Sequence, residues 1–329
     1  MPRRLAPFVI VGLSVFFAAA TPVASLAQAP DFILKWGSFG TTAGLFRNPH
    51  DVAVDAAGDV YVTDLNNHRV QKFSSTGTFL LQWGSLGSAN GRFNRPAGIA
   101  VDAGGNVFVV EENNNRVQKF TSTGTFLTKW GTAGPGVGQF NTPIDVAVDG
   151  AGDVYVADYH NSRVQKFTTD GTFLLQWGTS GSGNGQFHGA ASVGVDPSGY
   201  VYAGCGNTGR IQKFQSNGIH VLTWGSLGSG DGQFTSPTSI AVDPQHVVFV
   251  SDNLNHRIQM FTNTGGFIAT WGTFGSGDGQ FNNVTGVAAG IDGMIYTAEW
   301  NGQRVQKFGP VPVAGRTTTW GRVKALYRR

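Results

Sequence analysis

Acidic residues recur along this chain at intervals of 47 positions, and an arginine follows each of them five residues later. The acids are Asp64, Glu111, Asp158, Asp252 and Glu299, and the arginines are Arg69, Arg116, Arg163, Arg257 and Arg304. A ring of carboxylates could bind a cation such as calcium or zinc. Carboxylates that each meet an arginine would instead form ion pairs, worth about 0–1 kcal/mol apiece if they are exposed. We favour ion pairs that hold a loop within each repeat, because the spacing is the same in every copy.

The equivalent position in the fourth copy is Cys205, which leaves Arg210 without its expected partner. Cys205 is the only cysteine, so this chain cannot form an internal disulfide. His188 stands in the same copy, where the other copies have Asn, Arg or Thr. A single ligand must break the symmetry of a repeated structure, so these three residues form a candidate site. We favour the interpretation that the sequence of this one repeat has diverged without acquiring a function, and that its thiol is buried and inert.

A Trp-Gly pair closes each of six tandem units. The tryptophans are Trp36, Trp83, Trp130, Trp177, Trp224 and Trp271. In the unit 46–84, four segments rich in β-branched and aromatic residues, at 51–55, 60–64, 68–73 and 79–83, alternate with turns of Asp, Ser, Thr and Gly. Four antiparallel strands in a unit of about 40–50 residues are typical of propeller blades. The sequence therefore predicts an all-β fold, a six-bladed β-propeller of four-stranded antiparallel blades.

The two ends of the repeat array are incomplete in complementary ways. The first Trp-Gly pair ends a strand at 32–36, and the other three strands of a blade are missing before it. The last unit supplies only three strands, at about 284–290, 294–299 and 304–308. We predict that the N-terminal strand completes the last blade as its outer strand. This pairing would close the ring and leave few exposed strand edges.

Residues that repeat in every unit are predicted to be structural. Phe46 and Phe73 represent two series of phenylalanines that should form, with the tryptophans, the core between blades. Asp55 and its equivalents open the tight turn after the first strand, where a carboxylate can accept hydrogen bonds from the backbone. The third strand, which contains Arg69, is more polar than the first two and should lie nearer the outside.

The pattern P-x-[DG]-[VI]-A-V-D followed by V-[YF]-V-x-[DE]-x-x-N-x-R-[VI]-Q-K-F resembles the NHL repeat of six-bladed propellers. The matches lie at 49–73, 96–120, 143–167, 190–214, 237–261 and 284–308. Some copies depart from the pattern: Ala190 and Val284 replace the proline, Thr208 and Gly302 replace the asparagine, and Met260 replaces the lysine. The resemblance implies a module that binds protein or RNA, or a metal-dependent lyase.

In a propeller of this strand order, one face carries the loops after the second and fourth strands, and the other carries only tight turns. We name these the long-loop face and the tight-turn face, and we predict that ligands bind to the former, because loops on a rigid scaffold carry function. The candidate ligand-binding residues are His50, Asp51, Asn67, His68, Glu112, Asp145, Tyr159, His160, His188, Cys205, Arg210, His256 and Trp300. Their polar and aromatic side chains suit a peptide or a glycan.

The enzyme alternative depends on histidines from separate blades, as the resemblance to the lyases implies. His50, His68, His160 and His256 lie on loops that could converge on a metal. His68 and His256 occupy the same repeat position, at the periphery, which argues against convergence. The chain has no nucleophile–base pair at a recognisable spacing and no local metal motif. We therefore assign no catalytic residue and leave the metal and cofactor unassigned, with calcium or zinc as the alternative.

Both chain ends lie outside the predicted propeller, which spans residues 28–308. Residues 1–27 read as a signal peptide, with a basic start, a mostly apolar stretch at 5–20 and a small-x-small cleavage site before Gln28. We expect export to the periplasm, the cell-envelope exterior or the medium, and no membrane span. Residues 309–329 comprise a Pro/Gly linker and a short basic tail, for which we hypothesise a sorting or envelope-binding role.

Charge argues against nucleic acid as the partner. The chain has 23 Lys and Arg and 20 Asp and Glu, but seven of the basic residues fall in the signal peptide and the tail. The predicted propeller keeps 16 basic residues against 20 acidic ones, whereas a nucleic-acid binder needs a positive face. We predict a monomeric, secreted propeller that binds an extracellular or envelope protein, peptide or glycan. A metal-dependent lyase or hydrolase is the alternative, and RNA binding is disfavoured.

Overall fold

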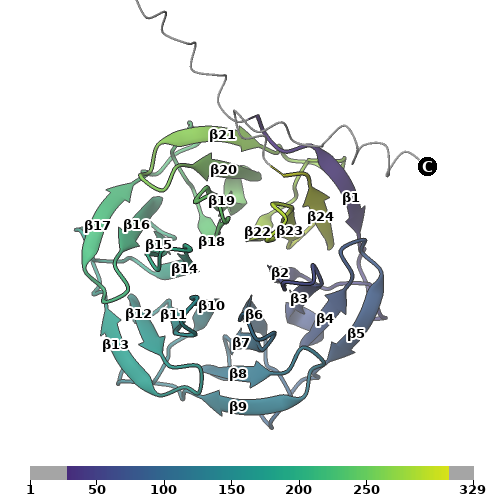
Figure 1. Cartoon of the computed structure of the whole chain (residues 1–329), viewed down its shortest axis with the longest axis horizontal. Coiled ribbons are helices and arrows are strands. Elements are labelled where there is room, and N and C mark those ends of the chain that lie inside the picture. The colour runs from purple at the N-terminus through teal and green to yellow at the C-terminus, as the bar shows by residue number, and fades with distance from the viewer. Residues whose placement is uncertain (1–27, 311–329) are drawn as a thin grey trace, which may run out of the picture.

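Six sheets of four antiparallel strands surround a central axis in the computed structural model, which describes residues 28–310 (Figure 1). In every sheet the first strand lies at the axis and the fourth at the circumference (Figure 1). The six-bladed, all-β propeller predicted from the repeat is confirmed.

The strand bounds repeat with the period of the sequence. Blade one contains β2 (Pro49–Val54), β3 (Val60–Asp64), β4 (Arg69–Phe73) and β5 (Phe79–Trp83), with the short 3-10 helix η1 (Leu65–Asn67). Blade two contains β6 (Pro96–Val101), β7 (Val107–Glu111), β8 (Arg116–Phe120) and β9 (Phe126–Trp130). Blade three contains β10 (Pro143–Val148), β11 (Val154–Asp158), β12 (Arg163–Phe167) and β13 (Phe173–Trp177).

The second half of the ring follows the same order. Blade four contains β14 (Ala190–Val195), β15 (Val201–Cys205), β16 (Arg210–Phe214) and β17 (His220–Trp224). Blade five contains β18 (Pro237–Val242), β19 (Val248–Asp252), β20 (Arg257–Phe261) and β21 (Phe267–Trp271), with the 3-10 helix η2 (Asn253–Asn255). Blade six contains β22 (Val284–Ala289), β23 (Ile295–Glu299), β24 (Arg304–Phe308) and β1 (Phe32–Trp36).

The N-terminal strand closes the ring as predicted. Strand β1 pairs antiparallel with β24, with Leu34 opposite Lys307 and Trp36 opposite Val305. The amide of Gly309 then donates to the carbonyl of Asp31 at 2.7 Å, so the two ends of the described chain are fastened to each other.

Aromatic side chains pack between neighbouring blades. The ring of Phe73 in blade one lies 5.7 Å from Trp36 of blade six and 5.7 Å from Phe46, which precedes blade one. The same trio recurs around the ring, for example with Trp83 against Phe120 at 5.8 Å. The predicted interblade core is therefore confirmed.

The tight turn after the first strand also has the predicted construction. Oδ1 of Asp55 accepts from the amides of Ala57 and Asp59, at 3.0 and 2.9 Å. The hydroxyl of Tyr61 donates to Oδ2 at 2.9 Å, which ties the turn to the next strand.

The polar third strand is not exposed, although it does lie third from the axis. Every residue of β4 is buried, and Arg69, Gln71 and Lys72 are 5 %, 0 % and 9 % exposed. We expected the polar side chains of this strand to mark a position nearer the outside, but the strand is buried. Its polar groups form hydrogen bonds inside the protein instead of with water.

Two predictions concern residues beyond the described part of the chain. The signal peptide at 1–27 lies outside it, and so does all but the start of the segment 309–329. Within residues 28–310, no helix is long and apolar enough to cross a membrane.

Candidate functional site

The two faces of the ring differ as the strand order predicts. On the long-loop face, Nδ2 of Asn67 in the loop after β3 donates to the carbonyl of Gly40 in the loop before β2, at 2.9 Å. On the tight-turn face, Nζ of Lys72 lies 2.8 Å from Oδ2 of Asp59 in the turn after β2. The long loops therefore touch one another, whereas the opposite face consists of short turns and lysines.

The repeated acids and arginines form buried ion pairs within the blades. In blade one, Nε of Arg69 donates to Oδ2 of Asp64 at 2.8 Å, and these residues are 5 % and 0 % exposed. The amide of Arg47 donates to the other carboxylate oxygen at 2.8 Å. Burial raises the pKa of Asp64, and these donors oppose that shift. The acids are thus enclosed in the blades and paired with arginines, which supports the favoured ion pairs over the alternative of a cation-binding ring.

Each arginine also holds the long loop that precedes its blade. The terminal nitrogens of Arg69 donate to the carbonyls of Thr41, Thr42 and Leu45, at 2.7 to 2.9 Å. Gln71 adds a donor to Leu45 and accepts from the amide of Gly44, at 2.8 and 2.9 Å. The ion pair predicted from spacing is confirmed, and it anchors the loop that enters the blade.

Blade four keeps the arginine but lacks its charge partner. Cys205 is fully buried, and burial raises the pKa of its thiol. Nε of Arg210 donates to Oγ1 of Thr208 at 3.2 Å, and its terminal nitrogens reach the carbonyls of Ser182 and Gln186. His188 is exposed, whereas Cys205 is not, so the fold does not present these residues as one joint surface.

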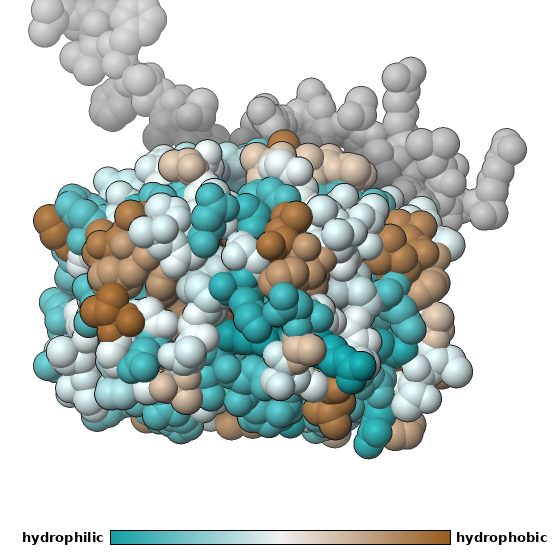
Figure 2. All heavy atoms as spheres, turned by 90° about the horizontal axis from the view of Figure 1, so that it is seen from below, coloured by the Kyte–Doolittle hydropathy of each residue, from teal (hydrophilic) through white to brown (hydrophobic). Residues whose placement is uncertain are grey.

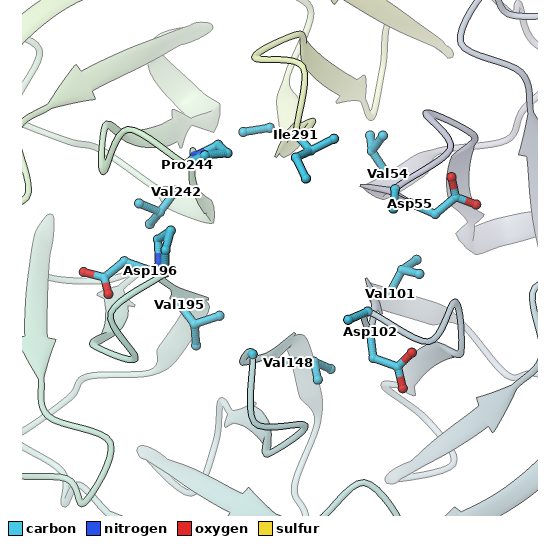
Figure 3. A pocket seen from close by; sticks show the side chains of 15 residues that line it. Val54, Asp55, Val101, Asp102, Val148, Val195, Asp196, Val242, Pro244 and Ile291 are labelled. Carbon is cyan, nitrogen blue, oxygen red and sulfur yellow. The ribbon is translucent and has the colours of Figure 1, made fainter.

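The central channel has an apolar mouth on the tight-turn face. A hollow of about 350 Å³ lies there, lined by the last residue of each innermost strand. These residues are Val54, Val101, Val148, Val195, Val242 and Ala289. Valine and isoleucine side chains point toward the axis, whereas the carboxylates of Asp55, Asp102 and Asp196 point away (Figure 3). The sequence analysis did not predict this hollow. The signal that could have revealed it is the apolar residue that stands directly before each turn aspartate.

Asp51 and Asp145, two predicted site residues, lie inside the channel at the third position of their strands. Oδ2 of Asp51 accepts from the amide of Ile99 at 3.0 Å, and Oδ2 of Asp145 accepts from Val193 at 2.8 Å. Both carboxylates are 5 % exposed, and each thus joins its blade to the next. Sequence reasoning missed Ser239, which does the same in blade five by accepting from Val287 at 3.2 Å.

Glycine occupies the equivalent place in blades two and six because the neighbouring backbone approaches closely. A Cβ on Gly98 would lie 2.6 Å from Cα of Asp145, and one on Gly286 would lie 2.7 Å from Cα of Asp51. The channel wall therefore combines side chains that bridge blades with glycines that let the next blade approach.

The buried carboxylates predict a pH-dependent stability. Burial raises the pKa of Asp51 to about 7. Burial, and then the charge of Asp51, raises the pKa of Asp145 well above its ordinary value. The folded protein therefore holds these protons more tightly than the unfolded chain does. Their contribution to stability is complete below about pH 4 and is lost as the pH rises toward 7.

Asp51→Asn should remove much of this dependence. We expect its free energy of unfolding, measured by urea denaturation, to fall less than that of the native protein between about pH 4 and 7. Asp231→Asn, at an exposed loop position, is the matched control and should keep the native slope. Equal slopes for Asp51→Asn and the native protein would contradict the prediction.

On the long-loop face, predicted site residues from four blades make contacts with their neighbours. The ring of Trp300 lies 5.7 Å from that of His50, and the ring of Tyr159 lies 4.9 Å from that of His160. Nε of Arg95 donates to Oε2 of Glu112 at 2.6 Å. Burial is the main cause that lowers the pKa of His50, so its imidazole is neutral near pH 7.

Two further predicted histidines on this face link neighbouring blades, and Asn67 makes a bond within its own blade. Nδ1 of His68 accepts from the amide of Arg95, and Nδ1 of His256 accepts from Asn283, both at 3.1 Å across a blade boundary. Asn67 donates to Oδ2 of Asp64 at 2.8 Å. Within residues 28–310, no group of three or more His, Cys, Asp or Glu could hold a metal ion. The fold therefore does not bring the four histidines of the lyase alternative together.

This geometry defines the chain as a six-bladed β-propeller. Comparison with known proteins identifies the repeat from which it is built. The family model for the NHL repeat matches residues 46–73, 93–120, 140–167 and 234–261. These are blades one, two, three and five, and the unmatched blades four and six are those in which the proline and asparagine of the pattern are replaced. The chain is an NHL-repeat propeller, as the resemblance of its repeats implied.

Two curated relatives share one short stretch with this chain. The B-box type zinc finger protein ncl-1 of Caenorhabditis elegans is 49% identical over 43 residues, which is 13% of this chain and 5% of the relative. Protein brain tumor of Drosophila melanogaster is also 49% identical over 43 residues, 13% of this chain and 4% of the relative. The similarity therefore extends over about one repeat of much longer proteins.

Solved structures share the fold over most of the chain. A gluconolactonase from Xanthomonas campestris has a TM-score of 0.60 at 13% identity, covering 88% of this chain and 97% of the other. Virginiamycin B lyase from Staphylococcus aureus has a TM-score of 0.56 at 12% identity, covering 82% of each chain. A Bacteroides thetaiotaomicron protein of unknown function has a TM-score of 0.64 at 18% identity, covering 87% of this chain and 74% of the other. At such identities the likeness concerns the fold alone.

Proposed function

We propose that this propeller is an exported binding module that docks a partner protein on its long-loop face. The observation that carries the proposal is an arc of exposed apolar residues at one repeated loop position. The arc consists of Phe39, Leu86, Leu227 and Phe274, which are 57 to 68 % exposed. Large apolar side chains that gather on one face of a soluble protein mark an interaction site.

The arc breaks the sixfold symmetry in the way that a single partner requires. Its residues lie in four consecutive loops, which join β17 to β18, β21 to β22, β1 to β2 and β5 to β6. The two remaining loops carry Ala133 and Ser180 at the same position. One side of the long-loop face is therefore apolar, and the opposite side is not.

The loops that carry the arc are held in one conformation. Phe39 forms an isolated bridge with Phe46, and the amide of Gly40 donates to the carbonyl of Phe46 at 2.9 Å. Arg69 holds three carbonyls farther along the same loop. Binding to a surface that is already ordered costs little conformational entropy, so the apolar contacts contribute fully to affinity.

Other exposed apolar residues do not share this placement. Leu80, Leu127 and Leu174 are 43 to 46 % exposed and lie at one position of the outer strands. Apolar residues recur along the side wall of the ring (Figure 2). Leu80, Leu127 and Leu174 lie on the outer strands of blades one to three and not in the long loops, which makes them suitable controls.

The alternatives have less support. The lyase and gluconolactonase structures support the propeller fold, and the histidines that a lyase would use are separated here. RNA binding needs a positive face, whereas the described propeller carries more acids than bases.

Replacing two arc residues should abolish docking without unfolding the protein. Photo-crosslinkers placed at positions 39 and 274 would identify the partner, which is then purified. We expect Phe39→Ser with Phe274→Ser to raise the Kd for that protein by about 100-fold or more, since buried anchors at an interface contribute about 2 kcal/mol each. Isothermal titration calorimetry measures Kd, and an unchanged Tm shows that the fold is intact.

The matched control is Leu127→Ser with Leu174→Ser, which alters equally apolar residues on the outer wall. Its Kd should equal the native value, and equal weakening by both double variants would contradict docking at the arc. The same preparation tests export. Expression of residues 1–329 should yield an extracytoplasmic protein whose N-terminal sequence starts at Gln28, as the signal peptide predicts.

A further inference from the structure

A second feature of the long-loop face is a pocket of about 280 Å³ at the channel mouth between blades five and six. It is lined by Thr238, Asn253, Asn283, Thr285, Trp300 and Asn301. The lining has three amides, two hydroxyls and one indole, and it has no charged side chain. We propose that this pocket binds a neutral saccharide unit.

The amides of the pocket position one another. Nδ2 of Asn301 donates to Oδ1 of Asn283 at 2.7 Å, and Nδ2 of Asn283 donates to Oδ1 of Asn253 at 3.1 Å. Nδ2 of Asn253 donates to the carbonyl of Val284 at 3.2 Å. Each primary amide has two N–H donors and two acceptor lone pairs, so this chain of bonds leaves donors and acceptors for a ligand.

The hydroxyl groups of the pocket are fixed by the propeller itself. Oγ1 of Thr238 donates to the carbonyl of Thr285 at 3.0 Å. Oγ1 of Thr285, which is 4 % exposed, lies 3.3 Å from the carbonyls of Pro49 and Ala298. The polar wall is therefore ordered before a ligand arrives, and binding to it costs little reorganisation.

Trp300 provides the apolar side of the pocket. Its carbonyl accepts from Nδ2 of Asn48 at 3.1 Å and from Nε2 of Gln303 at 2.9 Å, and its ring packs edge-on against His50. An indole held in this way offers a rigid apolar surface beside a polar wall. A sugar ring has the matching character, with C–H groups on its faces and hydroxyls at its rim that both donate and accept hydrogen bonds.

The same ring positions in other blades do not have this chemistry. Thr238 and Thr285 correspond to Ala97, Ile144 and Ala191, which are apolar, and to His50 in blade one, whose ring packs against Trp300. Trp300 and Asn253 correspond to Leu65, Glu112, Tyr159 and Gly206, and Glu112 is engaged with Arg95. Among the described blades, two threonines stand side by side at this position where blades five and six meet, so the hydroxyl-lined wall is a local specialisation rather than a property of the repeat.

The test uses purified residues 28–329 and three neutral probes: cellotetraose, maltotetraose and chitotetraose. Saturation-transfer NMR and tryptophan fluorescence would report binding. We expect at least one probe to bind saturably at concentrations below about 10 mM. Trp300→Ala and Asn301→Ala should each weaken that binding by about 10-fold or more. Asn301 is exposed, so its variant keeps the test valid if Trp300→Ala fails to fold.

Asn113→Ala, at the Asn301 position of blade two, is the matched control, because Asn113 is exposed like Asn301; it should bind the probe with native affinity. Lack of binding by all three probes would overturn the proposal, and so would native affinity in both pocket variants. This inference rests on the proposed use of the long-loop face for binding, but its failure can be distinguished from a failure of the docking proposal. The Phe39→Ser, Phe274→Ser protein should keep the saccharide and lose the partner protein, whereas the pocket variants should do the reverse.

Discussion

A protein that lacks residues 28–37 should unfold at a Tm lower by about 10–20 °C than the intact protein, because its ring is open. Strand β1 is the outer strand of blade six and pairs with β24, and Trp36 packs on Phe73 of blade one. Phe32 lies 6.1 Å from Phe308. Loss of these two partly exposed aromatics alone should cost roughly 5 kcal/mol. For a domain of this size, each kcal/mol corresponds to about 2–4 °C in Tm.

Calorimetry measures this effect, and a synthetic peptide of residues 28–37 provides a positive control. Added in excess, the peptide should occupy the vacant edge and raise the Tm of the truncated protein, because a ligand that binds only the folded state stabilises it. Lys35→Ala, an exposed change in the same strand, should leave the Tm near the native value. An unchanged Tm in the truncated protein would show that β1 does not close the ring.

The second large effect should come from removing the buried charge of Arg69. In Arg69→Met, Asp64 stays buried without its cation, and the carbonyls of Thr41, Thr42 and Leu45 lose their donors. Breaking one side of a buried ion pair costs about 3–5 kcal/mol. We expect the free energy of unfolding, measured by urea denaturation, to fall by that amount.

Blade four supplies the control for this experiment. Arg210→Met removes the equivalent arginine where Cys205 stands in place of the acid, so no carboxylate is left without a partner. We expect it to cost clearly less than Arg69→Met. Adding Asp64→Asn to Arg69→Met should recover part of the loss, since it removes the unpaired charge. Equal losses in the two blades would mean that the loop contacts, and not the ion pair, carry the stability.

The same network links stability to the proposed binding surface. Arg69 holds the loop that presents Phe39, and Arg304 does so for the loop of Phe274 by donating to the carbonyls of Gly277 and Gln280. A partner protein would therefore meet apolar side chains whose positions are set from inside the blades. This arrangement explains how loops rich in glycine can present a fixed surface.

The sequence by itself determined the features that depend on spacing. A period of 47 residues specified six blades, because one four-stranded sheet cannot bury both of its faces alone. The incomplete first and last units specified how the ring closes. The five-residue separation of Asp64 and Arg69 specified their pairing, since residues at the end of one strand and the start of the next meet across a short loop. These features are local or strictly repeated, so they need no knowledge of the neighbouring blades.

Only the tertiary structure decided depth and assembly. Spacing gives equivalent residues equivalent places in their blades, but it does not show whether those places are buried, and β4 proved to be buried throughout. Spacing also does not show which residues of different blades face each other across the central axis. Asp51 and Asp145 are 94 positions apart and yet influence each other's ionisation in the channel. The pocket beside Trp300 likewise combines residues of two blades. Such sites arise from the closure of the ring, which brings together side chains that no local pattern relates.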